Sequence, residues 1–414
     1  MSDTTINTNA SLRADATTIG IVALAHGTSH FFQLLLPPLF PWLATEFSLS
    51  FAQLGTLASM LYIVSALGQA ASGFLVDRIG AQPVMMGGLM LFVGAALVGA
   101  SATGYEMLML SAVLAGLGNS PFHPVDYSIL NQRVSSARLG HAYSAHGITG
   151  SLGYAAAAIV SVSIASAFSW RAALQVAALW ALLVLIVVVV FRSAITTPIH
   201  RANAASSNEA ARSTFGFLRL PIVWMCFAFF FILTFAGAAI QNFSTPALTQ
   251  IAGLSVTTAA TALTGYLVLG AVGQLAGGFL ASTARFDPDQ GITLALGLSM
   301  LLLLAAASGL ASGYGVAVLV MLAGFGTGVA VPSRDLLIKR ATPAGATGRV
   351  YGMVYSGLDA GLAVAAPLFG WLMDHGQPRG IFIGAAIAML ASMTLSWVVA
   401  RYSPRAAVPA QNLT

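Results

Sequence analysis

Long apolar runs recur along the whole chain, and each has about the length that a helix needs to cross a lipid bilayer. The hydrocarbon layer is about 30 Å thick, and a helix that rises about 1.5 Å per residue crosses it with roughly 20 apolar residues. Charged residues make up only 7% of the 414 residues, whereas soluble proteins contain about 25%. The sequence therefore excludes a water-soluble fold and predicts an all-α protein with many membrane crossings.

Glycine, proline and charged residues divide the chain into twelve predicted spans. These spans are 17–43, 52–76, 83–101, 107–132, 139–166, 170–192, 219–245, 256–281, 291–311, 314–338, 349–373 and 379–400. The longest polar break is rich in Ala, Ser, Asn and Arg, a composition typical of flexible linkers. We predict a tail at 1–16, a six-helix bundle at 17–192, a linker at 193–218, a second bundle at 219–400 and a tail at 401–414.

The distribution of cations predicts the orientation. When the loops are counted alternately, nearly all Lys and Arg residues fall on the side of the two termini, and only Arg171 and Arg379 fall on the other. Because cytoplasmic loops carry the excess of cations, this asymmetry predicts that both termini and the linker are cytoplasmic. The same asymmetry and the attraction of cations to anionic lipid explain the net charge of +5 without nucleic acid as a partner.

An internal repeat relates the two halves of the chain. A shift of about 208 residues places LAGLG (114–118) on LAGFG (322–326), and a nearly equal shift places GQAASGFL (68–75) on GQLAGGFL (273–280). Parallel repeats of this kind are typical of secondary transporters, which hold their substrate between the halves near the bilayer midplane.

Several classes of chemistry are excluded by missing signatures. The single lysine, Lys339, is followed by Arg340, so the chain has no phosphate-binding loop and cannot itself be an ATP-driven pump. No histidine is followed by Glu, and no G-x-S-x-G motif occurs, so metalloprotease and hydrolase signatures are absent. The single Cys226 has no partner for a disulfide or a zinc site. We expect no enzyme activity and no cofactor.

One loop motif resembles the major facilitator superfamily of transporters. GFLVDRIGAQ (73–82), at the end of the second span, is similar to the family's loop motif, whose Asp and Arg match Asp77 and Arg78. This resemblance implies a twelve-helix fold in two pseudo-symmetric six-helix bundles and a gating role for these two residues. The equivalent segment of the second half, GFLASTARFD (278–287), has lost the Asp.

A second resemblance narrows the family. GLGNSPFHPVDYS (116–128) and RLGHAYSAHGITGSLG (138–153) look like the fourth and fifth helices of fosmidomycin-resistance-type transporters. Two positions depart from drug antiporters: Ala112 stands where many of them have Arg, and Tyr154 follows Gly153 where they have Gly-Pro. The resemblance therefore does not establish drug antiport.

Charged residues within the spans are costly in lipid and so indicate function. On the tenth span, Arg334 and Asp335 follow Pro332. The planar guanidinium of Arg334 suits the carboxylate or phosphate of an anionic substrate. Alternatively, Arg334 pairs with its repeat equivalent, Asp126, and the two close the cytoplasmic gate together with Asp335.

Polar residues on the first and fourth spans predict a cavity lining. Asn119, His123 and Asp126 share one helix face, and His26 and His30 are one turn apart on another helix. Histidine titrates near neutral pH, so these rings could carry a proton or bind an anion, although hydrogen bonding between helices is an alternative role. Metal binding by the histidines of these two spans lacks an acidic or thiolate set to complete it, so we expect no metal site.

One isolated carboxylate predicts the proton-coupling site. Asp359 lies near the middle of the eleventh span, on one face with Tyr355. Burial disfavours the charged form of such a group, which suits a residue that gains and loses a proton; Asp126 is a second candidate. Other residues predicted to line the cavity are Tyr62, Tyr266 and His146.

Together, these features predict a monomeric transporter of the bacterial inner membrane. We expect it to move a small organic anion by proton-coupled alternating access, with the lipid bilayer and protons as its other partners. An alternative function is a proton-driven exporter of cationic or neutral drugs, in which Asp126 and Asp359 bind the cation.

Overall fold

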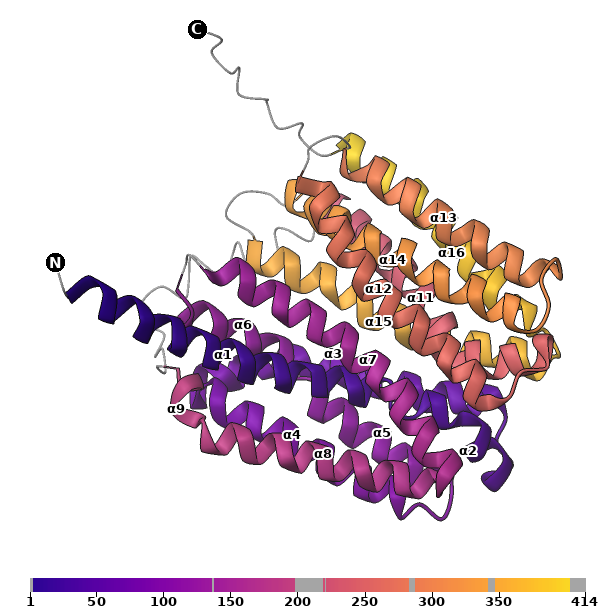
Figure 1. The fold of residues 1–414 in the computed structure, drawn as a ribbon, viewed down its shortest axis with the longest axis horizontal. Helices are drawn as coiled ribbons and strands as arrows, with labels where there is room; N and C mark the ends of the chain where they lie inside the picture. The colour runs from indigo at the N-terminus through magenta and orange to yellow at the C-terminus, as the bar shows by residue number, and fades with distance from the viewer. Residues whose placement is uncertain are drawn as a thin grey trace, which may run out of the picture.

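The computed structural model describes residues 3–135, 138–197, 219, 221–282, 287–341 and 347–402. Helices dominate these residues, and no strand occurs among them, which confirms the predicted all-α fold (Figure 1). The helices of the first half are α1 (Asp3–Gln33), η1 (Pro37–Leu39), α2 (Phe40–Phe47), α3 (Phe51–Ile79), α4 (Ala81–Ala100), α5 (Tyr105–Asn119), α6 (Phe122–Arg133), α7 (Leu139–Ala167), α8 (Trp170–Val190) and α9 (Arg192–Ile195). Those of the second half are α11 (Pro221–Ala252), α12 (Val256–Ser282), α13 (Pro288–Ser308), α14 (Tyr314–Ala341), α15 (Thr347–Asp374) and α16 (Arg379–Tyr402).

The number of crossings agrees with the twelve predicted spans once one broken helix is counted. In the part of the chain that the structure describes, 11 segments are long and apolar enough to cross a membrane. The remaining predicted span, 107–132, consists of two consecutive shorter helices, α5 and α6. The hydropathy pattern predicts one continuous helix for this span, whereas the structure divides it at Ser120 and Pro121.

Two prolines explain this break. Pro121 and Pro124 have no backbone N–H, so the carbonyls of Leu117 and Ser120 lose their usual helical donors. The hydroxyl of Ser120 donates to the freed carbonyl of Leu117 at 2.9 Å, which replaces one of the two lost bonds. Interrupted helices within a membrane occur where neighbouring groups satisfy the freed backbone.

The first span differs from its prediction at both ends. Helix α1 begins at Asp3, so it includes most of the segment that was predicted as a tail. It ends at Gln33, before Pro37 and Pro38 start a short 3-10 turn, whereas Pro246 at the repeat position lies inside α11. Most of the predicted linker and all but two residues of the predicted C-terminal tail lie outside the described residues.

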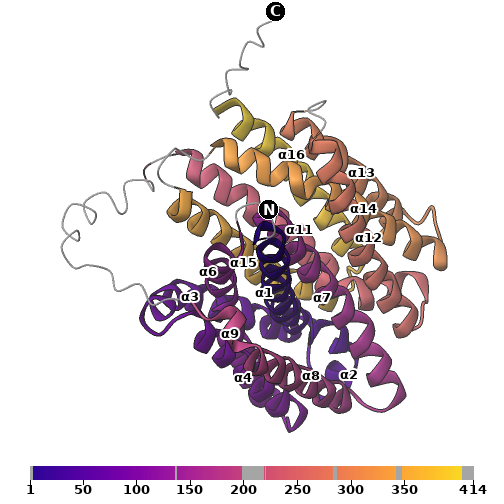
Figure 2. The ribbon, with the colours of Figure 1, turned by 60° about the vertical axis from the view of Figure 1, so that its left-hand side comes forward.

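The helices form two groups, which lie side by side (Figures 1 and 2). Helices α1–α9 make up one half and α11–α16 the other. Equivalent glycines bring equivalent helices together in each: a Cβ on Gly116 would overlap the carbonyl oxygen of Leu61, and one on Gly324 would overlap that of Tyr266. Helix α5 therefore packs on α3 as α14 packs on α12, in agreement with the repeat in the sequence.

Gly324→Leu should separate α12 from α14 and destabilise the second half. Because a backbone carbonyl occupies the position of the new side chain, we expect the substitution to cost about 3 kcal/mol. A thermal unfolding assay on the purified protein measures the effect. Gly87→Leu is the matched control, since nothing lies within 4 Å of a Cβ at Gly87; equal destabilisation by both variants would contradict this packing.

The two halves contact each other along α3 and α15 and along α7 and α12, and one set of these contacts lies at an end of the molecule. Helix α1 begins and α16 ends at what we call the near end, along the upper left side of Figure 1; the opposite end, at lower right, is the far end. There the carboxylate of Asp374, at the end of α15, accepts hydrogen bonds from the backbone N–H groups of Phe51 (2.7 Å) and Ala52 (2.8 Å), at the start of α3. Gly55 and Gly370 allow α3 and α15 to approach backbone to backbone. These contacts close the far end.

Candidate functional site

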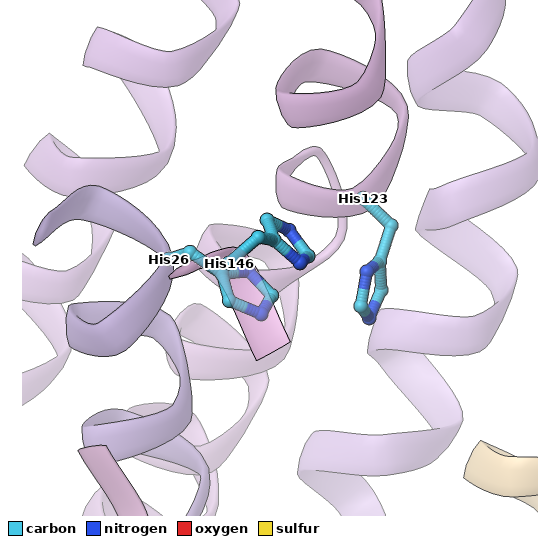
Figure 3. A group of neighbouring side chains, drawn as sticks. All are labelled: His26, His123 and His146. Atoms are coloured by element: carbon cyan, nitrogen blue, oxygen red, sulfur yellow. The ribbon is translucent and has the colours of Figure 1, made fainter. Parts of the chain in front are cut away.

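Four histidine side chains gather inside the first half. His26 and His30 come from α1, His123 from α6 and His146 from α7. The ring of His26 is stacked on that of His146 with centroids 3.4 Å apart, and its centroid is 4.4 Å from that of His30 and 5.4 Å from that of His123. Figure 3 shows three of these rings converging from different helices. We call the four residues the histidine cluster.

One buried carboxylate connects two rings of the histidine cluster. The side chain of Asp126 is 0% exposed, and its Oδ2 lies 2.9 Å from Nδ1 of His26 and 3.1 Å from Nε2 of His146. Its other oxygen, Oδ1, is buried without a hydrogen-bond partner among the described residues. An ionised carboxylate only accepts hydrogen bonds, so when Asp126 is ionised both of these ring nitrogens donate to it.

A second polar network adjoins the histidine cluster. Nε2 of Gln33 donates to Oδ1 of Asn119 at 2.9 Å, and the hydroxyl of Tyr154 donates to Oε1 of Gln33. Nδ2 of Asn119 donates in turn to Ser65 at 2.8 Å. The ring of Tyr154 lies 4.5 Å from that of His30, between the cluster and this network. The network thus joins α1, α3, α5 and α7 at the residue where α5 ends.

Asp359 faces this network from the second half. It lies on α15 and is partly buried, and its carboxyl interacts electrostatically with the hydroxyls of Tyr62 and Tyr154. The described residues give this carboxyl no hydrogen bond and no ion pair. A carboxyl group in this position can take up a proton without first breaking a salt bridge.

Arg334 lies on α14, in the second half. Its Nε donates to Oδ1 of Asp335 at 2.9 Å, and its guanidinium lies 4.9 Å from the ring centroid of Phe230. Asp126 instead accepts from two histidines, so the ion pair predicted between Asp126 and Arg334 is not a contact of this conformation. It stays a prediction for a conformation in which the near end is closed.

The remaining predicted residues lie away from these contacts or outside the described side chains. Tyr266 is buried in the apolar core, where α12 packs on α14. Arg78 is exposed near the end of α3. The side chains of Tyr355 and Asp77 lie outside the described residues, so their predicted roles stay predictions.

Part of the polar interior was not predicted from the sequence. No role was predicted for Tyr154 or Ser65, and His146 was only a minor candidate for the cavity lining. A pattern in the sequence could have identified two of them, because His146, Gly150 and Tyr154 follow at four-residue steps and therefore share one face of α7. The small Gly150 on that face lies against His26 and His30.

The sequence of this chain matches one family model and several known transporters. The sequence model of the Major Facilitator Superfamily matches residues 22–245 and 227–413. The fosmidomycin resistance protein of Escherichia coli is 27% identical over 270 residues, or 63% of this chain and 64% of that protein, so the match spans less than two thirds of that relative. The probable nitrate/nitrite transporter NarK2 of Mycobacterium tuberculosis is 27% identical over 77% of this chain and 80% of its own. The 4-hydroxybenzoate transporter PcaK of Pseudomonas putida is 27% identical over 36% of this chain and 34% of its own.

Solved structures share the fold at low identity. A mutant of the nucleoside transporter NupG superposes with a TM-score of 0.75 at 15% identity and covers 92% of this chain and 99% of that one. A bacterial homolog of the human lysosomal transporter Spinster, in an inward-facing and occupied conformation, gives a TM-score of 0.68 at 14% identity over 94% and 96% of the two chains.

Proposed function

This chain belongs to the major facilitator superfamily and is a multi-pass membrane transporter, and we propose that it moves a small organic anion by proton-coupled alternating access. The carrying observation is that the partly buried Arg334 offers a guanidinium to an anion within the second half, while Asp359 forms no salt bridge among the described residues. We place the protein in the bacterial inner membrane as a monomer with cytoplasmic termini.

Two observations support an anion as substrate. Guanidinium and imidazole groups donate hydrogen bonds to carboxylate oxygens, and a guanidinium offers two parallel donors. Arg334 keeps its guanidinium on the face of Phe230, where only 16% of the side chain is exposed. Two relatives are named for nitrate/nitrite and for 4-hydroxybenzoate, which are anions at neutral pH.

Proton coupling rests on Asp359. This residue comes from the second half and interacts with Tyr62 and Tyr154 of the first, so its charge affects both halves. A proton on Asp359 removes a negative charge from the space that an anion must enter. Protonation thereby favours anion binding, which couples the two movements thermodynamically.

The fold supplies elements that suit alternating access. At the far end the halves touch through hydrogen bonds and glycines of α3 and α15, and α7 also packs on α12. With cytoplasmic termini, the far end is the periplasmic side, and the conformation described here is closed to the periplasm. The break between α5 and α6 lies beside Asn119, within the polar interior, as in transporters whose binding sites use discontinuous helices.

A second candidate function is drug export. The fosmidomycin resistance protein of Escherichia coli is among the relatives, and Asp359, which lacks a salt bridge among the described residues, could pair with a cationic drug. Thermal stabilisation of the purified protein by a panel of organic anions, phosphonates, cations and neutral drugs separates the two functions. Stabilisation by anions supports the proposal, and stabilisation by cations or neutral drugs alone would replace it with export.

Arg334→Ala tests the predicted anion contact. A hydrogen bond to a charged group contributes about 1.5–3 kcal/mol, so we expect the affinity for a stabilising anion to fall roughly 10- to 100-fold. Arg334→Lys keeps the positive charge but loses the planar guanidinium. Its affinity for the anion should lie between those of the wild type and Arg334→Ala. Arg192→Ala, which removes an exposed arginine of α9, is the control. Unchanged affinity with slower transport would instead make Arg334 a gating residue.

A further inference from the structure

We propose that His26, His123 and His146 form a binding site for a divalent transition-metal ion. One nitrogen of each ring lies within 4.8 Å of a nitrogen of each of the other two. The three residues come from α1, α6 and α7, so all belong to the first half (Figure 3). This inference is independent of the proposed transport of an anion and assigns these three histidines a different ligand.

The spacing is close to that of a metal site. A tetrahedral zinc ion with Zn–N bonds of about 2.0–2.1 Å holds its nitrogens about 3.4 Å apart. The present nitrogens are at most 4.8 Å apart, so changes in the side-chain torsions can close the difference. Imidazole nitrogen is a preferred ligand of zinc, copper, nickel and cobalt, whereas calcium and magnesium prefer oxygen. The site therefore favours a transition-metal ion over calcium or magnesium.

Asp126 supplies the support that metal-binding histidines usually have. It accepts hydrogen bonds from one nitrogen of His26 and one of His146, and in a neutral imidazole the other nitrogen then carries the lone pair that binds a metal. Carboxylate–histidine–metal arrangements of this kind orient the ring and raise its basicity. The sequence alone does not show that Asp126 contacts both His26 and His146, which lie on two other helices.

The charge of the cluster also favours a cation. With Asp126 ionised and the three imidazoles neutral, the cluster carries a net negative charge in a site where His26 is 2% and His146 is 5% exposed. A buried carboxylate repels an anion, whereas a divalent cation compensates its charge. Beside the site, both ring nitrogens of His30 are buried without a hydrogen-bond partner among the described residues.

Binding of a metal would fix the second part of the broken helix. His123 lies one residue after the start of α6, just beyond the break at Pro121. A metal held by His123, His26 and His146 would tie α6 to α1 and α7. Because no ligand comes from the second half, the ion can stay bound while the two halves move relative to each other.

Cobalt(II) binding to the full-length protein tests the site. The protein, purified in detergent and treated with a chelator, is titrated with Co²⁺, whose visible absorption reports nitrogen ligands, and then with Zn²⁺ in competition. We expect one equivalent of Co²⁺ to bind and Zn²⁺ to displace it. His123→Ala should weaken Co²⁺ binding by about 100-fold or more. The ring of His123 makes no hydrogen bond among the described residues, so we expect the His123→Ala variant to fold.

The controls make the result decisive. His141→Ala removes an exposed histidine of α7 and should bind Co²⁺ as the wild type does. Asp126→Asn should weaken binding by roughly 10- to 100-fold, as expected when a carboxylate that orients a ligand is lost. Gel filtration and thermal unfolding without metal show whether each variant is folded. The absence of stoichiometric binding, or wild-type binding by folded His123→Ala, would overturn the site and leave the proposed transport function untouched.

Discussion

Gly55→Leu is expected to abolish transport while both halves of the protein stay folded. Gly55 lies on α3, where an added Cβ would overlap the carbonyl oxygen of Ala366 on α15, in the other half. The new side chain therefore opposes the contact between the halves and leaves the contacts within each half intact. We expect overpacking to destabilise the conformation with a closed far end by about 3 kcal/mol. Since each 1.4 kcal/mol changes an equilibrium constant about tenfold, the population of this conformation falls roughly 100-fold.

Transport by reconstituted protein measures this loss, and ligand-induced thermal stabilisation measures binding separately. We expect transport to fall by about 100-fold, because every cycle must pass through the conformation with a closed far end. Gly94→Leu is the matched control, since nothing lies within 4 Å of a Cβ at that glycine of α4. Wild-type transport by a folded Gly55→Leu variant would show that the close approach of α3 and α15 is not required.

Asp359→Asn is expected to uncouple transport from the proton gradient. An amide cannot exchange a proton in this pH range, so the variant should carry the substrate only down its own gradient. A pH difference of one unit supplies about 1.4 kcal/mol per proton, which corresponds to about tenfold accumulation for one coupled proton. In vesicles with such a gradient, we expect the wild type to accumulate substrate and the variant to stop at equal concentrations.

Counterflow separates coupling from binding. This exchange of substrate for substrate needs no net proton movement, so we expect Asp359→Asn to retain it within about twofold of the wild type. Glu106→Gln, which neutralises an exposed acid in the first turn of α5, should change neither measurement. Loss of exchange along with accumulation would show that Asp359 binds the substrate, as the drug-export function requires.

The fold was largely predictable, because its main constraint acts locally. A helix that crosses a bilayer needs an apolar run of a certain length, and that length can be counted in any single segment. The break at Ser120 and Pro121 was missed although the two prolines at 121 and 124 were visible, because a proline can also lie inside a membrane helix, as Pro246 does in α11. Helix α1 exceeds its predicted span because polar residues can extend a helix beyond the apolar run.

The site was predictable only in part, because it depends on contacts between distant segments. Spacing along one helix placed His26 with His30, and His123 with Asp126, on shared faces. It could not show that Asp126 accepts from His26, 100 residues away, and from His146 on a third helix. The repeat made Arg334 the natural partner of Asp126, but equivalent positions need not be neighbours in one conformation.

The contact between Asp374 and the start of α3 has a consequence for how easily the far end can open. The groups that it joins, a carboxylate and two backbone N–H groups, are all ones that water can hydrate after they separate. Ser50 and Gln53 form a capping box at the start of α3, which satisfies the N–H groups of these two residues when Asp374 leaves, and water can hydrate those of Phe51 and Ala52. Opening therefore exchanges one set of hydrogen bonds for another with little net enthalpy, a property that suits a contact made and broken once in every cycle.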